Sequence, residues 1–255
     1  MQRWAQRTVT VTAAALAVAA LCTTAAPAAV ATGDIGGATV VLDPGHGGSN
    51  GANDASLTRQ VPNGRGGTKD CQTTGTATDD GYPEHSFNWD VVQRVRAGLE
   101  QAGVHTVLTR GDDVSAGPCV DQRAAVANAV APAAIVSIHA DGGPVSGSGF
   151  HVNYSSPALN DAQSGPALRL ATTMRDALIA SGLTPAGYIG SDGLYGRADL
   201  AGLNLARYPA VLVELGNMRN SGEATRMESD SGRAEYAAAI VSGVADYLRS
   251  TSTTG

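Results

Sequence analysis

Three apolar runs along the chain each end in a polar residue able to bind a metal or carry a proton. The first run leads through Asp43-Pro44-Gly45 into His46, the second into His139 and the third into Glu214. The runs are residues 40–42, 135–138 and 210–213. Short apolar runs bounded by turn residues are typical of buried strands in a parallel sheet. Because sites in α/β folds are built where such strands end, we expect these three side chains to share one edge of the sheet.

Between these runs, apolar residues recur at helical spacing. In 84–101 they recur every four positions from Phe87 to Leu99, and Gly103 follows as a stop signal. The same periodicity predicts helices over 121–129, with Asp121 as its cap, 165–180 and 231–248, and strands are expected over 104–109 and 149–154. The alternation predicts one α/β domain over 38–249, with a mostly parallel twisted sheet and helices on both faces.

Three segments depart from this alternation. Residues 49–81 are polar, rich in Gly, Thr, Asn and Asp, and without periodicity, so we expect a long loop that is functional or mobile. Residues 186–203 are rich in Gly and carry two tyrosines. The end of the chain, 250–255, has a low-complexity sequence and is predicted to be a disordered tail.

The first 31 residues read as a removable targeting segment. Arg3 and Arg7 form a short positive region, and the apolar run 9–21 is too short to cross a bilayer. Ala29-Val30-Ala31 has the small residues of a signal-peptide cleavage site. We therefore predict a signal peptide over 1–31 and export to the periplasm, the cell wall or the medium. Cys22 raises the alternative of a lipoprotein, which the bulky Leu21 before it disfavours.

Charge and hydropathy exclude several classes of function. The net charge is −6 for the whole chain and −8 once Arg3 and Arg7 are removed. No cluster of basic residues is present, which argues against nucleic-acid binding. No second apolar span follows the signal peptide, so no transmembrane anchor is expected. We also expect a monomer, because the sequence shows no heptad repeat or exposed apolar stripe.

Two cysteines remain after the signal peptide. Cys71 and Cys119 are an even pair in an exported chain, which is typical of a disulfide. A metal-ligand or nucleophile role is the alternative, but neither cysteine has a CxxC partner or stands at a strand end. We therefore expect a disulfide that ties the 49–81 loop to the segment before Asp121.

The two histidines at strand ends indicate a metal site. A catalytic zinc ion takes three protein ligands, commonly imidazoles and a carboxylate, and leaves a position for water. A single histidine in such a turn is more often structural, but a pair at equivalent strand ends favours metal binding. From spacing alone the third ligand stays open among five residues: Glu84, His85, Asp141, His151 and Glu214.

The ordered set of motifs resembles a known family. DPGHGG at 43–48, Glu84 with Asn88 at a helix start, SIHAD at 137–141 and PAVLVELGN at 209–217 together are similar to the zinc-dependent N-acetylmuramoyl-L-alanine amidases of the cell-separation type. The insert that carries a cysteine, GYPEH and GFHVNY look most similar to the single-domain mycobacterial and actinobacterial members. The resemblance runs from residue 39 to residue 248.

The resemblance implies specific roles for four residues. It places the ligands of one Zn²⁺ ion on His46, Glu84 and His139, and a catalytic glutamate on Glu214. Of these four, Glu84 is the residue that an ordinary helix start would also explain, because an acidic residue in a first turn is favourable on its own.

Neighbouring motif positions are expected to support these four. Asp43 and Asp141 would orient ligands or turns, and Arg123 and Asn128 would pack and hydrogen-bond within a helix. Asn217 departs from the family pattern, in which a bulky apolar residue often follows the glycine, so the pocket wall is expected to differ there. His85 and His105 are expected to stay outside the metal site, and His151 to border the cleft.

The expected reaction is hydrolysis of the amide bond between the lactyl group of N-acetylmuramic acid and L-alanine, in peptidoglycan or in muramyl peptide fragments. Zinc would activate water, and Glu214 would act as general base and acid. Two alternatives stay open: another exported zinc hydrolase of peptidoglycan, such as a carboxypeptidase or deacetylase, or a non-catalytic wall-binding module. The module is disfavoured because all four chemical positions are filled.

Overall fold

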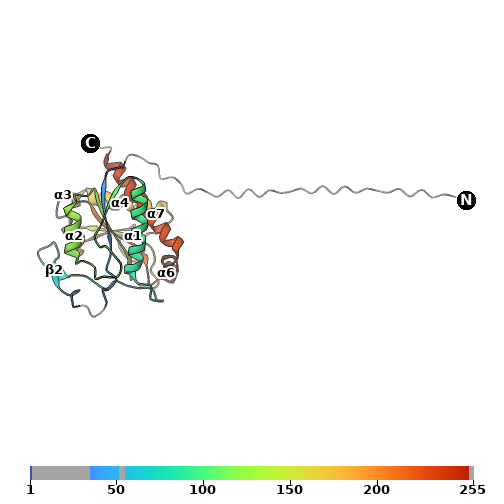
Figure 1. The fold of residues 1–255 in the computed structure, drawn as a ribbon, viewed down its shortest axis with the longest axis horizontal. Coiled ribbons are helices and arrows are strands. Elements are labelled where there is room, and N and C mark those ends of the chain that lie inside the picture. Colours follow the sequence, from blue (N-terminus) through green and yellow to red (C-terminus); the bar gives the residue numbers. More distant parts are fainter. Residues whose placement is uncertain (2–34, 52–54, 253–255) are drawn as a thin grey trace. The chain divides into compact units, whose positions relative to one another are not determined.

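The architecture is a six-stranded sheet between two layers of helices, which Figure 1 shows as a ribbon. This computed structural model describes Met1 and residues 35–51 and 55–252, so the rest of the predicted signal peptide and residues 253–255 lie outside it. The strands of the sheet are β1 (Thr39–Pro44), β4 (His105–Leu108), β5 (Ala134–Asp141), β6 (His151–Ser155), β7 (Leu194–Arg197) and β8 (Ala210–Asn217). A separate hairpin pairs β2 (Gln60–Pro62) with β3 (Thr68–Asp70).

The sheet is mostly parallel, as the alternation of elements predicts. Its order is β4-β1-β5-β8-β6-β7. The first four strands in this order run parallel to one another. β6 pairs with β8 in the antiparallel sense, and β7 is parallel to β6. The carboxyl ends of β1, β5 and β8 therefore lie together in the middle of the sheet, which brings the three polar ends of the apolar runs to one edge.

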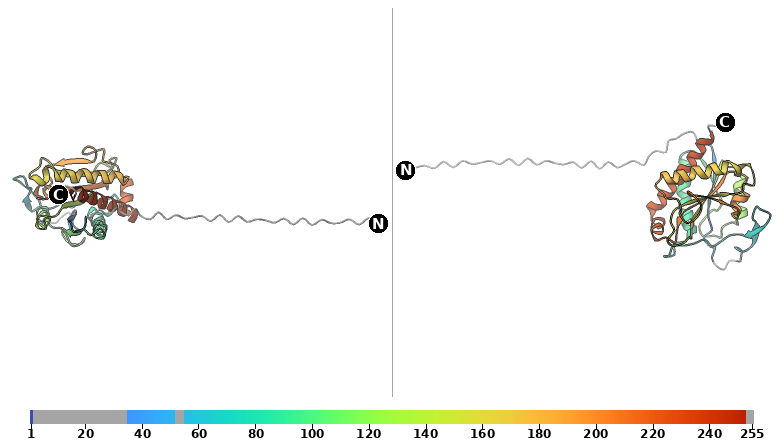
Figure 2. Two further views of the ribbon diagram at one scale, coloured as in Figure 1. Left: turned by 90° about the horizontal axis from the view of Figure 1, so that it is seen from above. Right: turned by 180° about the vertical axis from the view of Figure 1, so that it is seen from behind.

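Helices cover both faces of this sheet. They are α1 (Glu84–Gln101), α2 (Val120–Ala129), α3 (Asp161–Ser164), α4 (Pro166–Ala180), α5 (Ala201–Leu205), α6 (Ser221–Glu228) and α7 (Asp230–Ser252). α7 packs between α1 and α4, and the two views of Figure 2 show α4 in yellow and α7 in red. The smaller cluster on the other face packs residues of α2 and α5 against the sheet. The layers match the predicted fold class.

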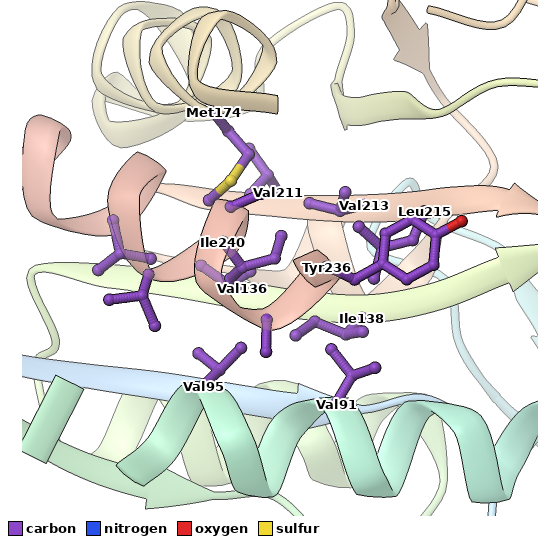
Figure 3. Packing of buried hydrophobic residues seen from close by; sticks show 14 of the residues in the cluster. Val91, Val95, Val136, Ile138, Met174, Val211, Val213, Leu215, Tyr236 and Ile240 are labelled. Carbon is purple, nitrogen blue, oxygen red and sulfur yellow. The ribbon is translucent and has the colours of Figure 1, made fainter. Parts of the chain in front are cut away.

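The main core lies under α1, α4 and α7. In Figure 3, Val91 and Val95 of α1, Tyr236 and Ile240 of α7 and Met174 of α4 converge on Val136, Ile138, Val211 and Val213 of the central strands. Alternate strand residues divide between the faces, so Val40 and Leu42 join this core while Val41 joins the smaller one. The rigid centre of the sheet thus supports the edge that carries the polar residues.

Several boundaries differ from the sequence prediction. The helix expected at 121–129 begins at Val120, because Cys119 is already extended and its N–H donates to the Gln122 side chain at 3.0 Å. Asp121 therefore lies inside the helix and is not its cap. The helix expected over 165–180 is α4, which begins one residue later with Pro166, a residue that needs no N–H partner at that position. The short helix α3 precedes it and was not predicted.

Other elements lie where no regular structure is predicted. The 49–81 segment contains the β2–β3 hairpin, and the segment 186–203 contains β7 and the start of α5. α6 also has no counterpart in the prediction; Asn220 caps it by accepting hydrogen bonds from Gly222 and Glu223. These elements are too short to show a clear period in the sequence.

The predicted disordered tail is wrong at its start. α7 continues to Ser252, so residues 250–252 are helical. The hydroxyls of Ser250 and Ser252 donate to the carbonyls of Tyr247 and Leu248, which suits a polar sequence to the last turn of a helix. Within the described ranges, no helix is both long enough and apolar enough to span a bilayer.

Candidate active site

Three residues with metal-ligand chemistry meet at the edge of the sheet where β1 and β5 end. His46 lies in the turn after β1, His139 lies on β5 and Glu84 is the first residue of α1. Nε2 of His46 is 3.0 Å from Oε2 of Glu84, and Nδ1 of His139 is 2.9 Å from Oε1. One ligand atom from each residue lies within 4.8 Å of the other two. The arrangement can hold one small cation.

The turn after β1 fixes the orientation of His46. Its Nδ1 lies 3.0 Å from the carbonyl oxygen of Thr73. A carbonyl only accepts, so Nδ1 carries the hydrogen and Nε2 is left with a lone pair directed at the cluster. His46 also adopts a φ of 61°, in the left-handed region that few side chains occupy. Burial opposes protonation of His46, but the Glu84 carboxylate outweighs it and raises the pKa of the imidazole.

Glu84 projects from the first turn of α1 into a shell of donors. Its Oε2 accepts from the N–H of Thr76 at 3.0 Å, and its Oε1 from Asn88 Nδ2 and the N–H of Ala140, both at 3.3 Å. Burial alone would raise the pKa of Glu84, but His46 and His139 lower it well below its usual value. The carboxylate is thus held ionised, as a metal ligand must be.

Two glycines make room for the cluster. A Cβ on Gly45 would collide with the ring of His139. Gly75 has a φ of 80°, and a Cβ there would approach Glu84 Oε2 and His46 Cδ2 to 3.0 Å. Sequence patterns alone do not single out either glycine, although Gly45 stands in the DPGHGG motif. Gly75 carries no local signal, because only the folded loop brings it against the cluster.

An ion pair that is largely buried holds the turn after β1. Arg123 of α2 pairs with Asp43 at 2.8 Å and also donates to the carbonyls of Pro44 and His46. Burial alone would raise the pKa of Asp43, but Arg123 and the hydroxyls of Ser137 and Thr109 lower it to about 2. The predicted supporting roles of Asp43 and Arg123 agree with these contacts.

Glu214 lies beside the cluster on the next strand. It is in register with His139 across the β5–β8 pair, so the two side chains point to the same face. Its Oε2 is buried and has no hydrogen-bond partner among the described residues. Burial, followed by the charges of Glu84 and Asp141, raises its pKa well above the usual value. The site therefore combines three ligand residues with one carboxylate suited to exchanging a proton.

The other histidines lie outside the cluster. His85 pairs with Asp113 at 2.9 Å and does not share a helix face with Glu84, its neighbour in the first turn of α1. His105 is exposed on β4. His151 is buried on β6, directly opposite Glu214 in the β6–β8 pair. Among the described residues, the group that could hold a metal ion therefore contains His46 and His139 but not these three histidines.

Three further predicted positions anchor loops around the edge. Asp141 accepts from the hydroxyl of Tyr188 at 2.8 Å. Asn128 links α2 to the end of α5 through the carbonyl of Leu205, at 3.0 Å. Asn217 is fully buried and donates to the carbonyls of Pro144 and Gly147 at 2.7 and 2.9 Å. At the position where the family often has an apolar residue, this chain therefore uses an amide to tie down the 142–149 loop.

The predicted disulfide is confirmed. Cys71 and Cys119 are bonded, and both are buried against Val61 of the β2–β3 hairpin. Cys71 stands two residues before Thr73, which orients His46, and Cys119 directly precedes α2, which carries Arg123. The bond therefore connects the two segments that hold the His46 turn.

A cavity of about 150 Å³ adjoins the cluster on the face of α2 and α5. His46, His139 and Ser137 line one end, and apolar residues such as Ala127 and Leu203 line the other. The space next to the ligand residues is thus largely apolar beyond its polar rim, which is typical of small-molecule sites.

Comparisons with known proteins agree with the motifs. The family model of N-acetylmuramoyl-L-alanine amidase matches residues 40–246. The chain is 61% identical to N-acetylmuramoyl-L-alanine amidase Rv3717 of Mycobacterium tuberculosis over 84% of this chain and 88% of that protein. Its fold matches the crystal structure of the amidase Ami1 from Mycobacterium smegmatis with a TM-score of 0.83 and 62% identity, over 86% of this chain and all of the other.

A more distant structure shows the same fold. The amidase AmiC2 of Nostoc punctiforme is 27% identical, with a TM-score of 0.62, over 83% of this chain and 97% of the other. The family match covers nearly the whole described domain, including all four residues of the site. The chain therefore belongs to the N-acetylmuramoyl-L-alanine amidase family of peptidoglycan hydrolases.

Proposed function

We propose that this amidase holds one Zn²⁺ ion with His46, Glu84 and His139 and uses Glu214 as its general base and acid. Two imidazoles and a carboxylate are a ligand set found in catalytic zinc sites. The observation that carries the proposal is the unpartnered Oε2 of Glu214, buried beside a cluster of ligand atoms within 4.8 Å. A buried carboxylate beside the ligand atoms that is not already saturated with donors can accept a proton from water.

Zinc bound at this cluster would supply Lewis acidity, which lowers the pKa of water towards ~7 and polarises an amide carbonyl. The Thr73 carbonyl keeps the His46 ring in place, and Asn88 holds Oε1 of Glu84. Glu214 takes the proton of the attacking water and passes it to the leaving amine nitrogen. Burial and the neighbouring carboxylates raise its pKa, so the group takes up a proton more readily than an ordinary glutamate does.

The bond cut is the amide between the lactyl group of N-acetylmuramic acid and L-alanine, in the wall polymer or in muramyl peptide fragments. The protein works as an exported monomer after removal of residues 1–31. The absence of basic clusters in the sequence argues against a nucleic-acid partner. Two other exported zinc hydrolases would use the same ligands, namely a carboxypeptidase and a deacetylase.

Product analysis separates these reactions. A defined muramyl pentapeptide is incubated with the zinc-loaded protein, and the products are identified by mass spectrometry. The amidase releases a peptide with a new L-alanine amino terminus. Release of D-alanine or acetate instead would assign the site to a carboxypeptidase or a deacetylase.

A substitution tests the role of Glu214. We expect Glu214→Gln to lower kcat by at least about 10³-fold, because the amide cannot accept the proton of water. The zinc content, measured by atomic emission, should stay at one per chain, because Glu214 is not a ligand. Glu100→Gln on the exposed face of α1 is the control and should keep full activity. Wild-type turnover in Glu214→Gln would remove Glu214 from the mechanism.

A further inference from the structure

His151 is a buried histidine that the mechanism above does not use. Its side chain lies on β6 and the residue is 2% exposed. Nδ1 of its ring is fully buried and has no hydrogen-bond partner among the described residues. The rings of Tyr188 and Tyr195 pack edge-on against it, with centroids 6.5 and 6.3 Å away. The imidazole is thus held in one place while one of its nitrogens is left unsatisfied.

The position of His151 relates it to Glu214. In the β6–β8 pair His151 is directly opposite Glu214, and in the β5–β8 pair His139 is opposite the same residue. Residues opposite one another share a face of the sheet, and their Cβ atoms lie about 5 Å apart. Glu214 therefore lies between a candidate metal ligand on one side and His151 on the other.

Both members of the His151–Glu214 pair have an unsatisfied buried atom. A buried polar atom without a partner costs about 1–3 kcal/mol, so two of them side by side call for a common explanation. One atom belongs to a carboxylate, which accepts, and the other to an imidazole, which can donate. The two atoms would satisfy each other directly or through one bridging water.

The surroundings of His151 keep its ring neutral. Burial lowers the pKa of His151 to about 4. The charged groups that act on the ring are Asp141, which opposes this shift, and Arg197 of β7, which adds to it; Tyr188 and Tyr195 pack on its sides. A neutral imidazole has one N–H, so it can donate to a carboxylate without bringing a full positive charge into the pocket.

We propose that His151 is the positioning residue of the general base: its ring N–H holds one carboxylate oxygen of Glu214 in the zinc-loaded protein. The other oxygen then faces the ligand cluster and carries the proton between water and the leaving amine. His151 neither gains nor loses a proton in this role. The inference rests on the proposed function of Glu214 and adds a residue of β6, the strand next to β8, to the same site.

Two substitutions at the same position provide the test. His151→Phe fills the space but removes the donor, whereas His151→Asn keeps an N–H close to the place of Nδ1. In the zinc-loaded enzyme, we expect Phe to lower kcat about 10–100-fold with KM within twofold of wild type, and Asn to recover most of the loss. His105→Phe, on the exposed edge strand, is the control and should leave both constants unchanged.

A double variant shows whether His151 acts through Glu214. In the Glu214→Gln background, His151→Phe should cause no further loss of kcat, because the group that it positions is gone. Thermal unfolding and zinc content are measured for every variant, so that a misfolded protein is recognised. An unchanged kcat in folded His151→Phe, or a rise in KM with kcat intact, would overturn the proposal; the second result would place His151 against substrate instead.

A spectroscopic measurement separates this inference from the function itself. In ¹⁵N-histidine-labelled, zinc-loaded protein, the ring N–H of His151 should give a downfield proton signal that moves in Glu214→Gln. An identical His151 signal in Glu214→Gln would refute the contact, whatever the activity. Failure of the wild-type enzyme to release L-alanine amino termini would refute the proposed function while this signal still decided the contact.

Discussion

Asp43 shows, at the scale of one residue, how the ligand cluster depends on side chains that do not belong to it. Its carboxylate accepts from Arg123, Ser137 and Thr109, and Arg123 in turn holds the backbone of the His46 turn. The Asp43 carboxylate is largely shielded from solvent and fully paired, so the removal of one partner is costly to the other. Loss of this one group would leave the Arg123 guanidinium buried without its partner.

The lowered pKa of Asp43 predicts how the stability of the protein depends on pH. The folded protein lowers the pKa of Asp43 from 3.8 to about 2, so the ionised form is favoured by about 2 kcal/mol. This stability is complete well above pH 4 and is lost as the pH falls through about 2. Asp43→Asn should therefore destabilise the protein by about 2 kcal/mol or more at pH 7, and the difference from wild type should shrink towards pH 2.

Urea unfolding at several pH values measures this difference. Asp246→Asn, which breaks an exposed ion pair with Arg249, is the control and should change stability by less than about 1 kcal/mol. A constant difference between Asp43→Asn and wild type from pH 7 to pH 2 would show that charge is not the cause.

Gly75 gives a second prediction at this scale. We expect Gly75→Ala to weaken zinc binding about tenfold or more, because the added methyl would press on Glu84 and His46. Gly81→Ala is a matched control, since Gly81 also has a positive φ, of 92°, but no atom within 4 Å of a new Cβ. Both variants should lose about 1 kcal/mol of stability to backbone strain. Equal zinc affinities in a competition assay would contradict the role of Gly75.

At the scale of elements, the disulfide joins the two segments that hold the His46 turn. Residues 72–76, which follow Cys71 and are here called the strap, contribute the Thr73 carbonyl and the Thr76 N–H to the cluster. The residues after Cys119 form α2, which carries Arg123. The strap has no regular secondary structure of its own, so its position depends on the covalent bond and on these contacts.

Removal of the disulfide is expected to affect both stability and metal binding. The bond joins two cysteines that are 48 positions apart in the sequence. Closing a loop of that length stabilises the fold by about 4 kcal/mol in the chain-entropy model. The double variant Cys71→Ser/Cys119→Ser should lose about that much stability, as measured by urea unfolding, and should bind zinc more weakly. A variant that loses stability but keeps the wild-type zinc affinity would show that the strap holds its place without the bond.

At the scale of the whole molecule, the candidate ligands join three parts of the chain. His46 follows β1, Glu84 begins α1 and His139 lies on β5, so successive ligands are 38 and 55 positions apart in the sequence. An ion that binds all three favours the folded chain over the unfolded one.

Metal removal tests this link. Dialysis against a chelator should lower Tm, and free zinc at 100 times its Kd should restore about 2.7 kcal/mol of stability. Differential scanning calorimetry measures both changes. His46→Ala should have the Tm of the metal-free protein before any chelator is added, and its Tm should not rise when zinc is added. A wild-type Tm that is the same with and without zinc would argue against metal binding at this cluster.

Local sequence patterns predict the class of fold, which the structure confirms, and three of the four candidate site residues. Buried apolar runs and helical periodicity are local patterns, so they predict strands and helices before any packing is known. His46, His139 and Glu214 were found because each directly follows or ends such a run. Glu84 was singled out by resemblance, because a helix start alone would explain an acidic residue there.

Only the tertiary structure decided what surrounds these residues. The antiparallel pairing of β6 with β8 places His151 opposite Glu214, and the strap after Cys71 places Gly75 beside Glu84. Neither relation has a local sequence signal, because each depends on segments distant in sequence that meet in the fold. Local patterns therefore determine which elements form, whereas long-range packing and register decide which side chains face one another.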